Sequence, residues 1–394
     1  MTFFAGGSMK ITDDILYAGV NDTKIDLFEG QFHVPNGMSY NSYIILDEKT
    51  AVMDSVDHHF GEEWISNIEK ICGEKTPDFL IVHHAEPDHS ANILRFAERF
   101  PNAKIVSSLM AFNMLKNYFG TDFSDRRIIV KEGDTLSLGK HTLQFISAPN
   151  VHWPEVMFSF EQTEKVLFSA DGFGKFGAID EKDPLYDWEC EARRYYFGIV
   201  GKFGANVQTA LKKASSLDIK ILCPLHGTVL SENVGKYIQL YDIWSSYGVE
   251  SEGIAIAYTS VYGHTEKAVK SLEKKLLNAG CKKCAVSDLA RCDIHEAVED
   301  AFRYGTLVLA TVTYNCDIFP SMKNFIEALK ERNYQNRKIA LIENGTWAPV
   351  AAKKIKALFE ESKNISFANT VITIKGEMTE ETDTQIDALV KEIV

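Results

Sequence analysis

The sequence has no long apolar run and no excess of positive charge, and each absence excludes a class of function. No stretch reaches the roughly 20 apolar residues that a membrane-spanning helix needs. The 394 residues carry a formal net charge of -13 at pH 7. An acidic surface repels nucleic-acid phosphates and anionic membranes, so we expect neither as a partner. The first residues also lack a secretory signal pattern, and we therefore expect a cytoplasmic protein.

Cysteine is scarce as well. The seven cysteines are an odd number and lie scattered along the chain, which argues against a framework of disulfides. Two of them form a single CxxC string, Cys281-Lys282-Lys283-Cys284. A rubredoxin-type iron site needs two such strings, so we interpret this pair as incidental.

The length exceeds what one hydrophobic core usually serves, so we predict two domains. In the second half, five strands alternate with helices within about 140 residues, which predicts a doubly wound parallel sheet. We place the domains at residues 9–250 and 251–394. Met9-Lys10-Ile11 has the pattern of a natural start, so residues 1–8 are expected to be an added leader.

Apolar periodicity predicts the individual elements. In the first half we expect strands near residues 43–46, 51–53, 79–83, 128–130, 143–146, 157–160, 166–169 and 219–223, and helices near 61–72, 90–100, 206–217 and 231–249. In the second half we expect strands near 253–259, 283–288, 306–312, 338–344 and 369–374, and helices near 266–277, 294–303, 320–331, 348–360 and 379–393.

Histidines and carboxylates gather at the ends of predicted strands in the first half. The candidate metal ligands are His84, Glu86, Asp88, His89, His152, Asp171 and His226. Imidazoles and carboxylates suit iron, zinc or manganese, and the absence of thiolates disfavours a structural zinc site. Alternation along an extended segment points His83 away from His84. His58 and His59 follow a turn and are expected to be solvated or to support the site.

Three loops of the second half carry polar and aromatic residues at strand ends. The first contains Thr259, Ser260, Val261, Tyr262, Gly263, His264 and Thr265. Hydroxyls and a helix N-terminus make a phosphate nest, and the absence of GxGxxG disfavours a dinucleotide site. The other two loops contain Thr311, Val312, Thr313, Tyr314 and Asn315, and Asn344, Gly345, Thr346 and Trp347. All three loops lie at the expected switch point of the sheet.

The His-x-Glu-x-Asp-His string, with its distant His, Asp and His, resembles the metallo-β-lactamase superfamily. Most hydrolases of that superfamily carry His at the position of Glu86, whereas Glu86 resembles the diiron branch, the flavodiiron proteins (A-type flavoproteins). His152-Trp153-Pro154 is also similar to that family. The first and third loops resemble flavodoxin loops that contact FMN, and the second resembles the family's Thr-Tyr-Asn flavin loop.

The resemblance implies an αββα metallo-β-lactamase-like sandwich followed by a flavodoxin-like doubly wound sheet. It implies one iron on His84, Glu86 and His152, a second iron on Asp88, His89 and His226, and Asp171 as the bridge. The roles of Glu29, Tyr195 and Tyr196 near the irons stay open.

The implied function is reduction of dioxygen to water or of nitric oxide to nitrous oxide, and the sequence does not choose between these gases. Electrons would pass through FMN from a separate donor such as rubredoxin. The family's arrangement implies a head-to-tail homodimer, with a homotetramer also open. Two alternatives remain: a dizinc hydrolase with a regulatory flavodoxin domain, and an FMN electron carrier without gas chemistry.

Overall fold

The computed structural model describes residues 2–3, 9–180, 182–183 and 185–394. The chain forms two compact units, Met1–Asp242 and Ile243–Val394. We keep the predicted limits, 9–250 and 251–394, as a proposal, because the first strand of the second unit begins at Ser251. The expected leader, residues 1–8, lies outside the described residues except for Thr2–Phe3, which pair as β1 with β2 (Met9–Lys10). No helix of the described chain has both the length and the apolarity to cross a membrane.

Two sheets form the frame of the N-terminal unit. The first has eight strands in the order β1, β2, β3 (Ile15–Tyr17), β8 (Tyr43–Ile45), β9 (Ala51–Met53), β10 (Phe79–Ile81), β11 (Lys104–Ser107) and β12 (Arg127–Ile129). The second has five strands in the order β13 (Thr135–Ser137), β14 (Thr142–Ser147), β15 (Met157–Glu161), β16 (Val166–Phe168) and β17 (Ile221–Cys223). Two short pairs accompany them, β4 (Val20–Asp22) with β7 (Met38–Tyr40) and β5 (Leu27–Phe28) with β6 (Phe32–His33).

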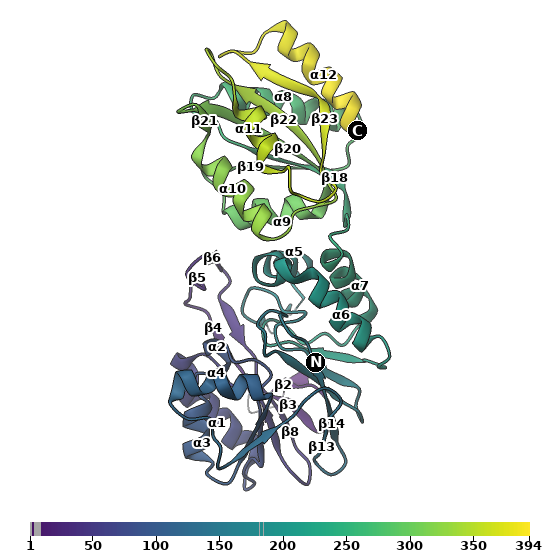
Figure 1. Cartoon of the computed structure of the whole chain (residues 1–394). Helices are drawn as coiled ribbons and strands as arrows, with labels where there is room; N and C mark the ends of the chain where they lie inside the picture. Colours follow the sequence, from purple (N-terminus) through teal and green to yellow (C-terminus); the bar gives the residue numbers. More distant parts are fainter. Residues whose placement is uncertain (1, 4–8, 181, 184) are drawn as a thin grey trace. The chain divides into compact units, whose positions relative to one another are not determined.

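The two sheets face each other across a shared core. Tyr43 and Ile81 of the first sheet pack in one buried cluster with Phe145 and Phe168 of the second. Helices α1 (Gly61–Cys72), α3 (Ile93–Arg99) and α4 (Leu109–Phe119) bury Trp64, Phe96 and Phe112 in a second cluster on the outer face of the first sheet. Helices α5 (Trp188–Tyr195), α6 (Gly204–Ala214) and α7 (Val234–Ser245) lie on the other side (Figure 1). The expected αββα sandwich is confirmed.

Helix α1 shows how the sequence produces this layering. Glu62 and Glu63 occupy its first turn, where carboxylates interact favourably with the helix dipole. Trp64, Ile65, Ile68 and Cys72 recur at helical spacing and are buried. The helix ends before Gly73, whose φ of 61° is a conformation that glycine adopts without strain. The indole of Trp64 also donates a hydrogen bond of 2.9 Å to Ser42 Oγ, which fixes the helix on the sheet.

The C-terminal unit has five parallel strands in the order β19, β18, β20, β22 and β23. Its elements along the chain are β18 (Ser251–Tyr258), α8 (His264–Asn278), β19 (Cys284–Asp288), α9 (Ile294–Arg303), β20 (Tyr304–Tyr314), β21 (Asp317–Ile318), α10 (Pro320–Glu331), β22 (Lys338–Asn344), α11 (Ala351–Leu358), β23 (Ser366–Ile374) and α12 (Glu380–Ile393). This is the flavodoxin-like strand order, so the predicted doubly wound sheet is confirmed.

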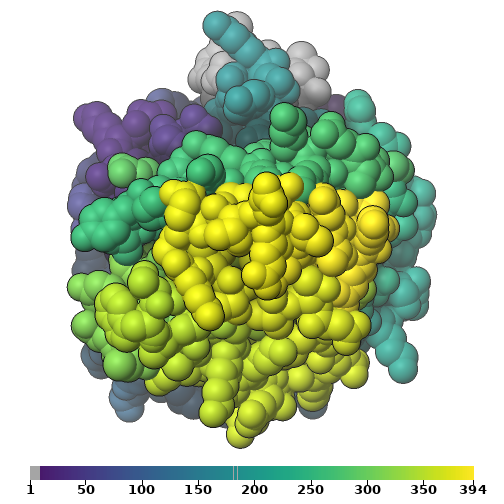
Figure 2. All heavy atoms as spheres, turned by 90° about the horizontal axis from the view of Figure 1, so that it is seen from above, coloured from purple at the N-terminus to yellow at the C-terminus, as the bar shows by residue number. Residues whose placement is uncertain are grey.

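Helices cover the C-terminal sheet. Helices α8 and α12 share one buried cluster, to which they contribute Leu272, Leu276, Ile386 and Leu389. The last part of the chain, coloured yellow, forms much of the surface seen in Figure 2. Helix α10 buries Phe325 and Ile326, so its apolar side faces inward as well.

One predicted loop of this unit is part of a strand. Strand β20 continues to Tyr314 and pairs antiparallel with β21. Asn315 and Cys316 form the turn between them, with φ values of 49° and 56°. Two successive residues with positive φ match the right-handed twist of a tight hairpin, and Asn tolerates that conformation. The segment after Thr311 is therefore an extension of the strand and a hairpin turn, rather than a loop.

Candidate metal centre and phosphate loop

The candidate ligands of the N-terminal unit all follow strands. His84 and Glu86 come after β10, and helix α2 (Pro87–Ser90) then presents Asp88 and His89. Pro87 suits the first position of this helix, because an N–H there would have no acceptor within the helix and proline lacks that N–H. His152 lies in the loop after β14. Asp171 and His226 follow β16 and β17, which run parallel, so their carboxyl ends meet at one edge of the sheet.

The first half of the site contains His84, Glu86 and His152. Glu86 Oε2 lies 3.1 Å from His84 Nε2 and 2.9 Å from His152 Nε2. Asp171 Oδ2 lies 3.3 Å and 3.1 Å from the same two nitrogens. The Nε2 atoms of both imidazoles therefore point at one position between the carboxylates of Glu86 and Asp171.

The second half contains Asp88, His89 and His226. Asp88 Oδ2 lies 3.2 Å from Nε2 of each histidine. The two Nε2 atoms are 2.9 Å apart. Asp171 Oδ1 lies 3.3 Å from His89 Nε2 and 3.7 Å from His226 Nε2. Asp171 thus turns one carboxylate oxygen toward each half, and the structure brings all seven predicted ligands together.

The donors fit two metal ions. Ligands that lie about 2.1 Å from one ion are separated by about 3 Å when they meet at a right angle, and the distances between these donors are close to that value. Asp88 Oδ1 and Oδ2 and Asp171 Oδ1 are buried without a hydrogen-bond partner, and so is His89 Nδ1. Buried carboxylate oxygens without donors are costly unless a cation satisfies them.

The site's electrostatics also favour cations. Burial alone would lower the pKa of His84, but the carboxylates of Asp171, Glu155 and Glu86 outweigh it and raise this pKa. Burial raises the pKa of Glu86, yet hydrogen bonds from His152 and His84 lower it to about 2. The same competition raises the pKa of His152 to about 9. Because imidazole protons neutralise the carboxylates in the metal-free site, metal binding must release protons.

Three residues that the sequence did not single out support the site. Glu155 and Ser39 hydrogen-bond to ligands, and Asp54 hydrogen-bonds to their neighbour His83. Glu155 Oε1 accepts hydrogen bonds from His84 Nδ1 at 2.8 Å and from the Ala85 N–H at 2.9 Å. The carbonyl of Ser39 lies 2.7 Å from His226 Nδ1. A hydrogen-bond acceptor at Nδ1 leaves the Nε2 lone pair free for a metal. Glu155 directly follows His152-Trp153-Pro154, and its place beside this motif could have marked it in the sequence as a supporting residue.

The third supporting residue, Asp54, holds the neighbour of the ligands. Its carboxylate lies 2.5 Å from His83 Nδ1 and accepts from the His83 N–H at 2.7 Å. His83 Nε2 lies 2.7 Å from Ser159 Oγ. The expectation that His83 points away from His84 is therefore confirmed. His58 and His59 are 66% and 70% exposed, which confirms that they are solvated.

Glu29, Tyr195 and Tyr196, whose roles the sequence left open, differ in how close they lie to the metal ligands. The ring of Tyr195 lies 5.6 Å from that of His226, whereas Tyr196 packs against Tyr241. Glu29 lies at the tip of the β5–β6 hairpin with a φ of 50°. Desolvation and the carboxylate of Glu86 raise the pKa of Glu29, although much of its surface is exposed. Tyr195 and Glu29 are thus the open candidates that lie near the site.

In the C-terminal unit, buried hydroxyls join the predicted loops. Thr259 Oγ1 and Thr311 Oγ1 are 2.7 Å apart; Thr259 directly follows β18, and Thr311 lies beside it in the neighbouring strand β20. Ser260 Oγ accepts from the N–H groups of Gly263 and Glu266 at 3.1 Å and 3.3 Å. Helix α8 starts at His264, so its first N–H groups open toward the same loop. These features favour a phosphate nest at this loop, which stays a prediction.

Each of the three predicted loops carries an exposed aromatic residue. Tyr262 is 87% exposed and Trp347 is 85% exposed, while Tyr314 is 46% exposed. Thr265 and Asn344 are buried between their loops, and Asn344 Nδ2 lies 3.5 Å from Thr265 Oγ1. Large rings left in solvent beside a phosphate nest suit a planar ligand that stacks on them.

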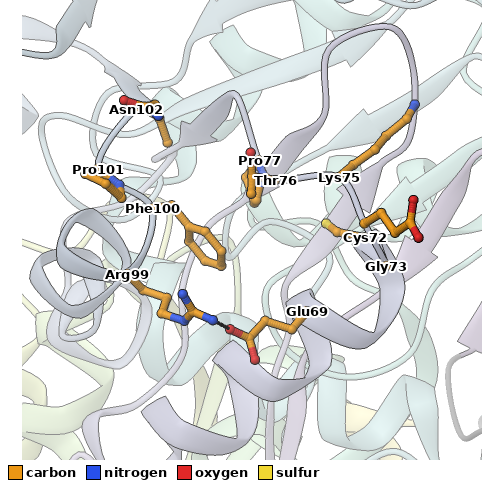
Figure 3. Close-up of a pocket in the computed structure, with 12 residues that line it drawn as sticks. Glu69, Cys72, Gly73, Lys75, Thr76, Pro77, Arg99, Phe100, Pro101 and Asn102 are labelled. Carbon is orange, nitrogen blue, oxygen red and sulfur yellow. Dashed lines mark ion pairs between the residues drawn. The ribbon is translucent and has the colours of Figure 1, made fainter.

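A separate cavity lies away from the metal ligands. It measures about 240 Å³, and its lining includes Cys72, Pro77, Arg99 and Ala103 (Figure 3). Pro77 and Ala103 precede β10 and β11, so this cavity is at the amino-terminal ends of these parallel strands. The candidate ligands follow the carboxyl ends, and the cavity is therefore not part of the metal site.

Comparisons with known proteins relate the chain to a family model and to curated relatives. A family model described as ODP family beta lactamase matches residues 38–227. The chain is 33% identical over 333 residues to the nitric oxide reductase of Moorella thermoacetica, and the match covers 82% of each chain. It is 27% identical over 360 residues to the anaerobic nitric oxide reductase flavorubredoxin of Vibrio vulnificus, covering 89% of this chain and 72% of the relative.

Solved structures resemble the whole chain. The flavodiiron protein of Giardia intestinalis superposes with a TM-score of 0.91 at 27% identity, covering 99% of this chain and 97% of the other. The rubredoxin oxygen:oxidoreductase of Desulfovibrio gigas gives a TM-score of 0.89 at 25% identity, with 98% and 97% covered.

Proposed function

The chain belongs to the flavodiiron protein family, and we propose that it reduces dioxygen to water, nitric oxide to nitrous oxide, or both, at a diiron centre. It is an oxidoreductase with FMN and two irons as its cofactors. The position of Asp171 carries the proposal. Its two carboxylate oxygens face two separate groups of ligands, which is the arrangement that a bridge between two ions requires.

We assign His84, Glu86 and His152 to one iron, Asp88, His89 and His226 to the other, and Asp171 to both. When bound, the irons supply electrons and open coordination positions for the gas, and FMN delivers electrons to them. The protein's own contribution is orientation. Glu155 Oε1 accepts a hydrogen bond from the His84 Nδ1–H, and the Ser39 carbonyl accepts one from the His226 Nδ1–H. Both histidines are then held with Nε2 toward the metals.

Glu86 supports redox iron over hydrolytic zinc. With Asp88 and Asp171 it gives the site three carboxylates, which lie among four imidazoles. Each additional negative charge stabilises the more oxidised metal ion, because the attraction grows with the ion's charge. A dizinc hydrolase gains nothing from that charge, since zinc does not change oxidation state.

We propose that FMN binds at the three loops of the C-terminal unit. Its phosphate would accept hydrogen bonds from the N–H groups that begin α8, and its ring would lie near Tyr314 and Trp347. The names of the relatives support a rubredoxin-type donor, and we propose one as a separate protein. We also propose a head-to-tail homodimer, or a homotetramer built from such dimers, as the assembly that joins FMN to the irons.

The test is anaerobic reduction of the purified protein followed by parallel measurement of oxygen and nitric oxide consumption, with iron, zinc and FMN quantified in the same sample. We expect two irons and one FMN per chain, and gas consumption that depends on a reduced rubredoxin. Zinc without iron, together with no consumption of either gas, would overturn the proposal in favour of a hydrolase.

A matched variant separates the diiron chemistry from the flavin. Asp171→Ala should bind at most one iron per chain and lose gas consumption, but it should keep FMN and its reduction by the donor. If Asp171→Ala consumed gas at the rate of the unaltered protein, gas consumption would not need the bridge and the diiron proposal would fail.

A further inference from the structure

We propose that Cys281 and Cys284 form a reversible intramolecular disulfide by exchange with a soluble disulfide. The sequence alone marks this pair as incidental, and the structure changes that interpretation. The two sulfurs lie 3.7 Å apart. Neither Cys281 nor Cys284 is in a disulfide, so the pair is present in its reduced form. The inference is independent of the proposed gas chemistry, because it concerns only the C-terminal unit.

The hydrogen bonds of the two thiols hold the sulfurs facing each other. Cys284 Sγ donates to Cys281 Sγ, and Cys281 Sγ donates to the Lys283 carbonyl at 3.3 Å. A disulfide needs a sulfur–sulfur distance of about 2.05 Å. The two sulfurs must therefore approach by less than the length of one S–S bond, and only Lys282 and Lys283 separate the cysteines where the chain passes from α8 to β19.

The pair is accessible to a reagent from solution. Both cysteines are half-buried, and β19 is an edge strand of its sheet. Cys281 also lines an open cavity of about 550 Å³, together with Glu252, Gly280 and Lys282. Both side chains pack against the core of the unit, but of the two only Cys281 lines this cavity. A soluble disulfide can thus reach Cys281 before Cys284.

The exchange has two balanced steps. The Cys281 thiolate attacks one sulfur of a disulfide RSSR, forming a mixed disulfide and releasing RS⁻, which takes up the proton lost by Cys281. The Cys284 thiol then loses its proton, attacks Cys281 Sγ and releases the second RSH. The sum is one protein disulfide and two RSH, so RSSR is reduced by two electrons. In the reduced pair, burial and the neighbouring Cys281 raise the pKa of Cys284 to about 12, which disfavours Cys284 as the thiol that attacks first.

The position of Cys281 and Cys284 after the C-terminal end of α8 affects whether the dithiol or the disulfide is favoured. In helix-N-terminal CxxC sites the helix dipole stabilises the thiolate, and this favours the reduced form. Here the pair follows the C-terminal end of α8, where the dipole disfavours a thiolate. The reduced form gains no such stabilisation, so we expect the disulfide to be stable once it has formed.

The test treats the full-length holoprotein with glutathione disulfide under anaerobic conditions, followed by denaturation, alkylation and peptide mass analysis. We expect the protein to carry two alkyl groups fewer than a dithiothreitol-treated sample. The peptide that contains Cys281 and Cys284 should be two hydrogens lighter, and dithiothreitol should reverse both changes.

Single variants test the order of attack. Cys284→Ser should keep a glutathione adduct on Cys281 at least about tenfold longer than the unaltered protein does, because the resolving thiol is gone. Cys281→Ser should form neither disulfide nor adduct at this string. Cys292→Ser removes a half-buried cysteine of the same unit and should oxidise like the unaltered protein.

Two results would overturn the proposal. The first is full alkylation of both cysteines after treatment with glutathione disulfide. The second is zinc held by the pair, seen as bound metal and as alkylation that begins only after a chelator is added. The glutathione measurements need neither iron nor gas consumption, so they can fail or succeed separately from the proposed function.

Discussion

Glu155→Ala should weaken iron binding although Glu155 contacts no metal position directly. Its carboxylate is almost completely buried and accepts two hydrogen bonds, from His84 Nδ1 and from the Ala85 N–H. Removing it leaves two buried donors without an acceptor. It also frees the His84 ring to rotate or to place its proton on Nε2, the nitrogen that would bind iron.

The size of the effect follows from these contacts. Loss of an acceptor behind a metal-ligating histidine typically costs about 10- to 100-fold in metal affinity, or roughly 1.4 to 2.7 kcal/mol. The metal-free fold should also lose about 1–3 kcal/mol for each unsatisfied buried donor. Glu155→Gln keeps an acceptor oxygen of the same reach and loses only the charge. Its effect on iron affinity should therefore be smaller than that of Glu155→Ala.

The assay is competition for ferrous iron against a chelator of known affinity, under anaerobic conditions, with urea denaturation of the metal-free proteins in parallel. We expect the order unaltered protein, Glu155→Gln, Glu155→Ala, from tightest to weakest iron binding. If Glu155→Ala bound iron within about twofold of the unaltered protein, the orientation of His84 would not depend on Glu155 and our reasoning would fail.

Three further predictions concern the bridge, the core and the flavin loops. Asp171→Ala should bind at most one iron per chain, measured by metal analysis, and retention of two irons would contradict the bridging role. Trp64→Ala should destabilise the N-terminal unit by about 3–5 kcal/mol in urea denaturation, because the indole is fully buried and bonded to Ser42; a loss below about 1 kcal/mol would contradict this. Trp347→Ala should weaken FMN binding by about tenfold in a fluorescence titration. Because Trp347 is largely exposed, the same change should alter the stability of the FMN-free protein by less than about 0.5 kcal/mol. Unchanged FMN affinity would place this side chain away from the flavin.

Several elements could be predicted from the sequence because local signals agree with the packing. Helices α1, α9 and α10 and strand β22 have the predicted limits. Their ends are marked in the sequence. The Asp293 side chain caps α9, Pro320 begins α10 and Gly73 ends α1.

Other elements could not be predicted, for reasons that the structure makes plain. Helix α4 was not expected, because Leu109, Met110 and Tyr118 on its outer side are about half exposed and hide the helical period. Strands β2 to β7 have two or three residues each, too few for a period of two to be visible. Strand β20 continues past its predicted end because β21 pairs with it, and short antiparallel pairs of this kind depend on turn geometry.

The ligand set could be proposed from the sequence because its members share one property, their place after strands. What the sequence could not supply was the pairing between them. Glu86 and His152 are 66 positions apart along the chain, and their contact depends on how β10 and β14 lie in two different sheets. Glu155 was missed for the same reason, since its partner His84 is 71 positions away.

The negative charge of Glu86 changes the net charge of the metal site. In the structure its Oε2 touches both histidines of the first half, so the carboxylate is a full member of that half. A histidine at this position would leave Asp88 and Asp171 as the only carboxylates among the seven ligands. Two ferrous ions with three carboxylates carry a net charge of about +1, against about +2 with two. If two irons held here were oxidised, two positive charges would be added to a buried site, and the third carboxylate would lower the electrostatic cost of holding them.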